Sequence, residues 1–201
     1  MKNLYTPLLC LLILLLGVHA NAQTFVSTSP ENKNVVLEEF TGIHCTYCPD
    51  GHRLAQILKD ANPNDVTLIN IHVGSYATPS LGEPDFRTSF GTAIMNQSSL
   101  AGYPAGTINR KSFTSQGWDQ NGGTAMSRSY WDDAAAVVLP TSSYVNVAAQ
   151  ASIDVTTRLL TVDVETYYTA NGASANYLNV ALLQNNVAGP QTGSVYNPSQ
   201  I

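Results

Sequence analysis

Two cysteines with two residues between them are the side chains in this sequence best suited to chemistry. The segment Cys45-Thr46-Tyr47-Cys48 follows a short apolar stretch and precedes Pro49, a residue favoured in the first turn of a helix. The unpaired N–H groups and the dipole at a helix N-terminus favour a thiolate over a thiol. We therefore predict that Cys45 is the nucleophile of a thiol–disulfide exchange site and that Cys48 is its resolving thiol.

Two other interpretations of this pair stay open. The bridge could be an inert disulfide in a binding domain, or the sulfurs could join His44 or His52 in a metal site, because zinc accepts both ligand types. A disulfide closing so short a loop adds only about 2 kcal/mol in the chain-entropy model, against about 4.7 kcal/mol for a hundred-residue loop, which argues against a purely structural bridge. The sequence has no second cysteine pair to complete a zinc site. We accordingly predict no metal and no cofactor.

The elements around the cysteines read as a strand, a helix and a second strand. Residues 35–40 and 66–73 are apolar stretches of strand length, and Leu54, Ile57, Leu58 and Ala61 have the spacing of an apolar helix face. This order favours an α/β domain in which a helix joins parallel strands. Further along, we expect an insertion at 74–99 containing a short helix at 85–97, a strand at 105–110 and a helix at 124–139.

The sequence changes character after residue 140. Residues 145–153 and 159–168 alternate apolar and polar side chains, as half-buried strands do, and residues 177–184 form a third candidate strand. We predict a sandwich-like antiparallel β domain over residues 141–201. A single sheet with one apolar face needs a covering layer, so we expect this domain to be incomplete and the chain to continue past Ile201.

The first 22 residues have the features of a secretory signal. Lys2 gives a positive start, residues 8–16 are an apolar run, and Ala20-Asn21-Ala22 offers a cleavage site. The run is too short to span about 30 Å of hydrocarbon. Its removal, before a polar lead-in at 23–32, would leave Cys45 and Cys48 as the two cysteines, which we expect to pair in an oxidising compartment. The net charge of −5 disfavours a nucleic-acid partner.

The sequence also resembles a known superfamily. Val36-Leu37-Glu38-Glu39-Phe40-Thr41-Gly42 followed by Cys45-Thr46-Tyr47-Cys48-Pro49 looks like the active-site strand and helix of thioredoxins. The resemblance implies a thioredoxin-like domain over residues 33–140. It also implies that Tyr103 and Pro104 form a cis-proline loop that binds the substrate backbone, and that Glu39 is a buried acid that moves the proton of Cys48. Glu39 could instead be a solvated carboxylate at the end of its strand.

A narrower resemblance indicates where such a protein would work. The Leu-Glu-Glu-Phe-Thr-Gly run, the Cys-x-x-Cys-Pro-x-Gly-His pattern ending at His52, and Tyr-Pro-Ala-Gly-Thr-Ile-Asn-Arg are similar to the 28-kDa outer-membrane protein family of Bacteroidetes. This implies an exported protein of the periplasm, outer membrane or cell surface. Its partners would be exported protein thiols or disulfides or, if the domain is a non-catalytic binding or adhesion module, an unknown surface ligand.

The residues beside and between the cysteines differ from those of thioredoxin itself. The dipeptide is Thr46-Tyr47 and not Gly-Pro, and no tryptophan precedes Cys45. The insertion at 74–99 is also extra. We expect His44, Thr46 and Tyr47 to tune the reduction potential of the pair, and about 30 mV of such tuning corresponds to 1.4 kcal/mol for a two-electron couple.

Overall fold

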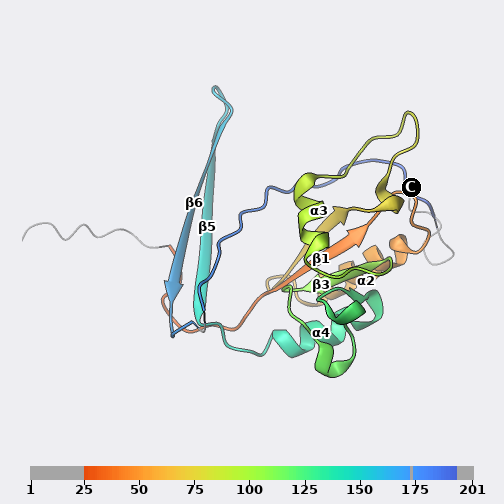
Figure 1. Cartoon of the computed structure of the whole chain (residues 1–201). Helices are drawn as coiled ribbons and strands as arrows, with labels where there is room; N and C mark the ends of the chain where they lie inside the picture. The colour runs from red at the N-terminus through yellow and green to blue at the C-terminus, as the bar shows by residue number, and fades with distance from the viewer. Residues whose placement is uncertain (1–24, 173, 194–201) are drawn as a thin grey trace, which may run out of the picture. The chain divides into compact units, whose positions relative to one another are not determined.

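The computed structural model describes residues 25–172 and 174–193, and its contacts divide them into two units (Figure 1). One unit contains residues 31–143 and 174–193, and the other contains residues 25–30 and 144–172. The expected secretory signal lies outside the described residues. Within the described ranges, no helix is both long enough and apolar enough to cross a bilayer.

The larger unit is built on a four-stranded mixed sheet with the order β2-β1-β3-β4. β1 (Val35–Thr41) is parallel to β2 (Val66–His72) and antiparallel to β3 (Ala105–Ile108), which pairs in turn with β4 (Met126–Ser127). The helix α2 (Cys48–Ala61) connects the two parallel strands. The predicted strand–helix–strand order is therefore confirmed, and β1 has a hydrogen-bonded neighbour on each side.

The other helices of this unit are shorter than predicted. α3 (Ser89–Asn96) falls inside the range 85–97 given by the sequence. The helix predicted at 124–139 is confirmed only as α4 (Trp131–Val138), because the residues of β4 are held by pairing with β3. A strand edge can recruit a few residues in this way even where their spacing also suits a helix.

The buried face of α2 is rotated from the predicted one. Leu58 is buried as expected, but Ile57 is 53% exposed and Ala61 is also exposed. Gly51 and Ala55 are buried in their place. The helix thus turns its small residues to the sheet, which lets its backbone approach β1 closely, and a prediction from large apolar side chains misses such a face.

The predicted strand at 105–110 ends at Ile108. Asn109 and Arg110 adopt the left-handed backbone region, with φ of 52° and 47°, which ends the extended conformation. The side chain of Asn109 then bonds back to the start of β1, accepting the N–H of Val36 at 2.6 Å and donating to the carbonyl of Asn34 at 2.8 Å.

The two faces of β1 pack against different helices. Leu37 belongs to a core cluster with residues of α2 and α4, whereas Phe40 packs with residues of α3. Because side chains alternate along a strand, Glu39 shares the face of Leu37 and Glu38 shares the face of Phe40. Two neighbouring carboxylates are therefore buried on opposite sides of the same strand.

The smaller unit is a long hairpin. β5 (Val145–Asp154) and β6 (Leu159–Tyr168) are antiparallel, with Asp154 opposite Leu159 at the turn and Val145 opposite Tyr168 at the other end. Both strands are confirmed, but residues 177–184 form no strand, because none of the described strands pairs with them. The chain therefore shows an α/β sheet with helices and a separate two-stranded antiparallel sheet.

Residues 25–30 are held by side chains of this hairpin. Glu165 Oε2 accepts the backbone N–H groups of Phe25 and Val26, at 2.6 Å and 3.1 Å. The side chain of Asn146 donates to the carbonyls of Ser27 and Ser29. Most of the hairpin's apolar side chains are nevertheless exposed, so this unit contributes little buried core.

Candidate functional site

Cys45 and Cys48 form a disulfide at the N-terminus of α2, with Cα atoms 5.4 Å apart. The helix begins at Cys48 and has Pro49 in its first turn, as predicted. Cys45 lies in the preceding turn, where its N–H donates to the carbonyl of Gly42. Cys45 is 3% exposed and Cys48 is fully buried, so Cys45 is the more accessible of two well-covered residues. The expected pairing of the cysteines is confirmed.

Pro104 and Glu39 meet at the first turn of α2. The Tyr103–Pro104 peptide bond is cis, as the resemblance implied. A Cβ atom placed on Gly51 would lie 2.9 Å from Cβ of Pro104 and 2.6 Å from Oε1 of Glu39. Only a glycine leaves room for both groups so close to the helix backbone. The structure thus brings two sequence-predicted site residues, Pro104 and Glu39, to the turn of helix that follows Cys48.

The side chain of Tyr103 faces away from this contact. Its hydroxyl donates to the carbonyl of Val73 at 3.2 Å, and its ring packs edge-on against Tyr76 with centroids 5.4 Å apart. It also lies over Gly74, whose φ of 68° and lack of a side chain make room for the hydroxyl. Tyr103 therefore anchors the loop that carries Pro104.

Glu39 is buried, with 1% of its surface exposed. A hydrogen bond of 3.0 Å joins its Oε2 atom to Nδ1 of His52, and Nε2 of His52 lies 3.3 Å from Oγ1 of Thr41. Burial raises the pKa of Glu39 and outweighs the lowering effect of His52. Burial would lower the pKa of His52, but the hydrogen bond and the charge of Glu39 raise it above its usual range. The buried-acid interpretation is thus the one that fits Glu39.

His52 was not among the residues predicted to take part in exchange. The sequence signal that could have pointed to His52 is its spacing, because it follows Cys48 by four residues and residues four apart share a helix face. Its partner Glu39 lies thirteen positions earlier on another element, so no local pattern connects the two.

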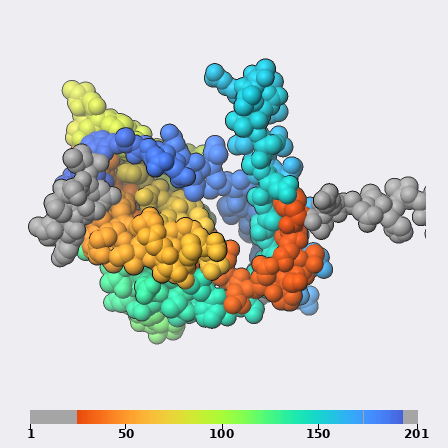
Figure 2. Space-filling view, turned by 180° about the vertical axis from the view of Figure 1, so that it is seen from behind, coloured from red at the N-terminus to blue at the C-terminus, as the bar shows by residue number. Residues whose placement is uncertain are grey.

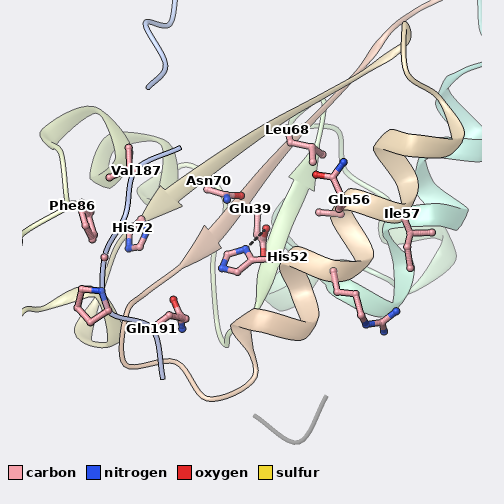
Figure 3. Close-up of a pocket in the computed structure, with 14 residues that line it drawn as sticks. Glu39, His52, Gln56, Ile57, Leu68, Asn70, His72, Phe86, Val187 and Gln191 are labelled. Carbon is pink, nitrogen blue, oxygen red and sulfur yellow. Dashed lines mark hydrogen bonds and ion pairs between the residues drawn. The ribbon is translucent and has the colours of Figure 1, made fainter. Parts of the chain in front are cut away.

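His52 also lines a cavity of about 600 Å³ between α2 and β2 (Figure 3). Its walls come from β1, α2, β2, Phe86 and residues 187–191, and Figure 3 shows Glu39 and His52 together at the α2 side with His72 and Phe86 further along. Burial, and then the charge of His52, lower the pKa of His72. The cavity therefore holds a neutral histidine opposite a proton-binding pair.

Asp50, in the first turn of α2, binds the side chains of two arginines. Arg53 donates to Oδ1 of Asp50 at 2.7 Å and Arg128 donates to Oδ2 at 2.7 Å. Burial would raise the pKa of Asp50, but these hydrogen bonds and charges more than offset it and hold the pKa below its usual range. The guanidinium of Arg128 also lies 5.9 Å from the ring of Tyr47. The positive charge of Arg128 is thus held near Tyr47, one of the two residues between the cysteines.

The three residues predicted to tune the reduction potential are partly or fully exposed: His44, Thr46 and Tyr47. His44 Nε2 is 2.9 Å from Oε2 of Glu83, a residue of the 74–99 segment. Thr46 is exposed, and Tyr47 is 53% exposed. Among residues 25–172 and 174–193, no group of three or more His, Cys, Asp or Glu side chains could hold a metal ion.

A later stretch of the chain binds the loop that carries Cys45. The side-chain amide of Gln191 donates to the carbonyls of Gly42 and Cys45, at 3.2 Å and 3.1 Å. The N–H of Thr192 donates to the carbonyl of Ile43 at 2.7 Å. Figure 2 shows this part of the chain (blue) crossing the surface beside α2 (orange). No feature of the sequence predicts this contact, and we call residues 187–192 the strap.

Comparisons with protein-family models, with curated proteins and with solved structures find no match.

Proposed function

We propose that this protein catalyses thiol–disulfide exchange through Cys45 and Cys48. The observation that carries the proposal is the meeting of three groups at one turn of helix. A disulfide opens α2, and Pro104 and the buried carboxyl of Glu39 both contact that helix at Gly51, three residues after Cys48. A structural disulfide has no need of a buried ionisable group beside it.

The exchange reaction needs one attack at each sulfur–sulfur bond. A substrate thiolate attacks Sγ of Cys45, and the bond to Cys48 breaks, so that Cys48 leaves as a thiolate and takes up one proton. A second substrate thiolate then attacks the substrate sulfur of the mixed disulfide and releases Cys45 as a thiolate. The substrate gains a disulfide and the protein gains two reduced cysteines; the reverse sequence reduces a substrate.

The surrounding groups suit these steps. The N-terminus of α2 favours the thiolate of Cys45, since the first N–H groups of a helix lack internal partners. Glu39, whose pKa is raised by burial, is able to hold the proton that Cys48 needs. Pro104 would hold the substrate backbone across the disulfide. We further propose that the α/β unit is thioredoxin-like and that the protein acts on exported proteins of the periplasm, outer membrane or cell surface.

Trapping of mixed disulfides tests this proposal. Cys48→Ser leaves Cys45 free to attack but removes the thiol that resolves the intermediate, so we expect it to accumulate covalent complexes with envelope proteins. Cys45→Ser is the matched control, because it keeps one cysteine at the same helix end and should trap none. If both variants trap equally, or neither traps, the exchange proposal fails.

The burial of both sulfurs favours a second candidate, a binding or adhesion module that keeps an inert disulfide. Under that function the bridge would resist reduction, with a potential below about −300 mV, whereas exchange predicts a potential above about −250 mV. Equilibration of the folded protein with glutathione or dithiothreitol buffers separates the two.

A further inference from the structure

The two carboxyl oxygens of Glu39 have different surroundings. Oε2 is hydrogen-bonded to His52, on the side of the cavity. Oε1 has no hydrogen-bond partner among the described residues and lies against Gly51 and Pro104, on the side of the helix turn that follows Cys48. An unsatisfied buried oxygen is costly and calls for an explanation. Oε1 of Glu39 is therefore free to exchange a proton with a group that becomes charged only during the reaction.

Glu39 has almost no access to solvent of its own. His52 does, because its ring lines the cavity and its side chain is 16% exposed, against 1% for that of Glu39. The cavity is large enough to admit water. Glu39 also lines the cavity, but the imidazole is the more exposed of the two groups and therefore offers the better route for a proton, with Nδ1 facing Glu39 and Nε2 lying 3.3 Å from Oγ1 of Thr41.

We propose that His52 is a positioning residue that carries protons between the cavity and Glu39, and thereby sets how fast Cys48 is protonated when the disulfide opens. The inference rests on the proposed function and adds a route for the proton. When the bond to Cys48 breaks, Glu39 gives its proton to the Cys48 thiolate. The carboxylate then takes a proton from Nδ1 of His52, and the imidazole regains one from the solvent of the cavity, so that one proton is taken up from solution per opening.

The charged neighbours of His52 come from three elements. Glu39 faces it from β1, His72 shares the cavity from β2, and Arg53 lines the cavity from α2. Burial, and then the charge of His52, lower the pKa of His72. Arg53 is bonded to Asp50, so its charge is partly balanced. Glu39 is thus the group whose proton His52 is placed to supply.

Opening of the disulfide by a water-soluble phosphine tests this route without a protein substrate. The phosphine attacks one sulfur and displaces the other as a thiolate; water then hydrolyses the thiophosphonium to phosphine oxide, so the disulfide takes up two electrons and both cysteines end as thiols. In the full chain, we expect His52→Ala and His52→Gln to slow the opening about tenfold or more at pH 7, since proton transfer by a placed side chain commonly contributes at least that much. Gln56→Ala, on the same helix and the same cavity, is the matched control and should keep the wild-type rate.

Two further readouts separate proton transfer from packing. Added imidazole should restore the rate of His52→Ala, because the lost ring leaves space beside an open cavity, but not that of His52→Gln. The pH dependence of the wild-type rate near neutrality should disappear in both variants. Wild-type rates and pH profiles in both variants, or full activity of His52→Gln, would overturn the inference. Failure of mixed-disulfide trapping would instead overturn exchange on proteins and leave this result standing.

Discussion

Glu38 and Glu39 are neighbours on β1 and both are buried, but their carboxyl groups differ in how many hydrogen bonds they form. Glu38 receives hydrogen bonds from Thr107 and from two nitrogens of Arg110, so both of its oxygens are satisfied. Glu39 forms one hydrogen bond, with His52, and its second oxygen has none among the described residues. A saturated carboxylate serves the fold, whereas an unsaturated one beside a disulfide is suited to chemistry.

Removing the arginine that binds Glu38 should have the largest effect on the free energy of unfolding. Arg110→Ala leaves the buried carboxylate of Glu38 without its partly exposed cation, and an unsatisfied buried charged group costs about 3 kcal/mol. Arg87→Ala is the control, because Arg87 and Asp85 form a similar pair on the surface and such pairs contribute less than about 1 kcal/mol. Urea denaturation of both variants measures the difference. Equal losses would show that the Glu38 pair is not a structural element.

Separating Glu39 from Pro104 should have the next largest effect. Gly51→Ala places a methyl group within 3 Å of both residues, and overpacking of this kind costs about 1–3 kcal/mol. We also expect slower opening of the disulfide, because the carboxyl must move. Gly102→Ala serves as the control, since a Cβ there meets no atom within 4 Å. Thermal unfolding and phosphine kinetics provide the two readouts; an unaffected Gly51→Ala would contradict the close contact.

The smallest effect concerns how stability changes with pH. Glu39 and His52 both have a raised pKa in the folded state, so between their ordinary and folded values the folded protein binds more protons than the unfolded chain. Stability from the pair is therefore full below about pH 4.5, the ordinary value for Glu39, and falls as the pH rises through the folded pKa values. Each pKa unit of elevation corresponds to about 1.4 kcal/mol.

Glu39→Gln should flatten this dependence, because it removes one titrating group and the cause of the raised pKa of His52. Denaturation midpoints at pH 5, 7 and 9 measure it: relative to Glu39→Gln, the wild type should lose stability as the pH rises. A wild type that gains relative stability with pH would show that Glu39 is ionised in the fold. Glu38→Gln, on the other face, provides the comparison.

The sequence was informative where a signal is local. Strand length and apolar content located β1 and β2, and the spacing of Cys45 and Cys48 with Pro49 located the start of α2. The hairpin of the smaller unit followed from alternation in the same way. These features depend on neighbours in the chain, which a single sequence displays.

Contacts between distant segments were not predictable. Nothing near Glu38 indicates Arg110, which reaches it because of a left-handed turn after β3, and nothing near Glu39 indicates His52. Residues 177–184 show the opposite error, because their apolar pattern suits a strand but no partner strand is present among the described residues. Pairing is a property of two segments, and one segment cannot specify it.

The strap links the turn that carries Cys45 to a segment almost 150 residues later in the chain. Gln191 and Thr192 occupy three carbonyls of the turn that carries Cys45, so a ligand that competes for those carbonyls must loosen the strap, and a pull on the strap must free the carbonyls. By reciprocity, the two events change each other's free energy by the same amount. Mechanical tension along this stretch of backbone would therefore act on the turn that carries Cys45, and the rate of hydrogen exchange at the amide of Thr192 would report whether the strap is bound to that turn.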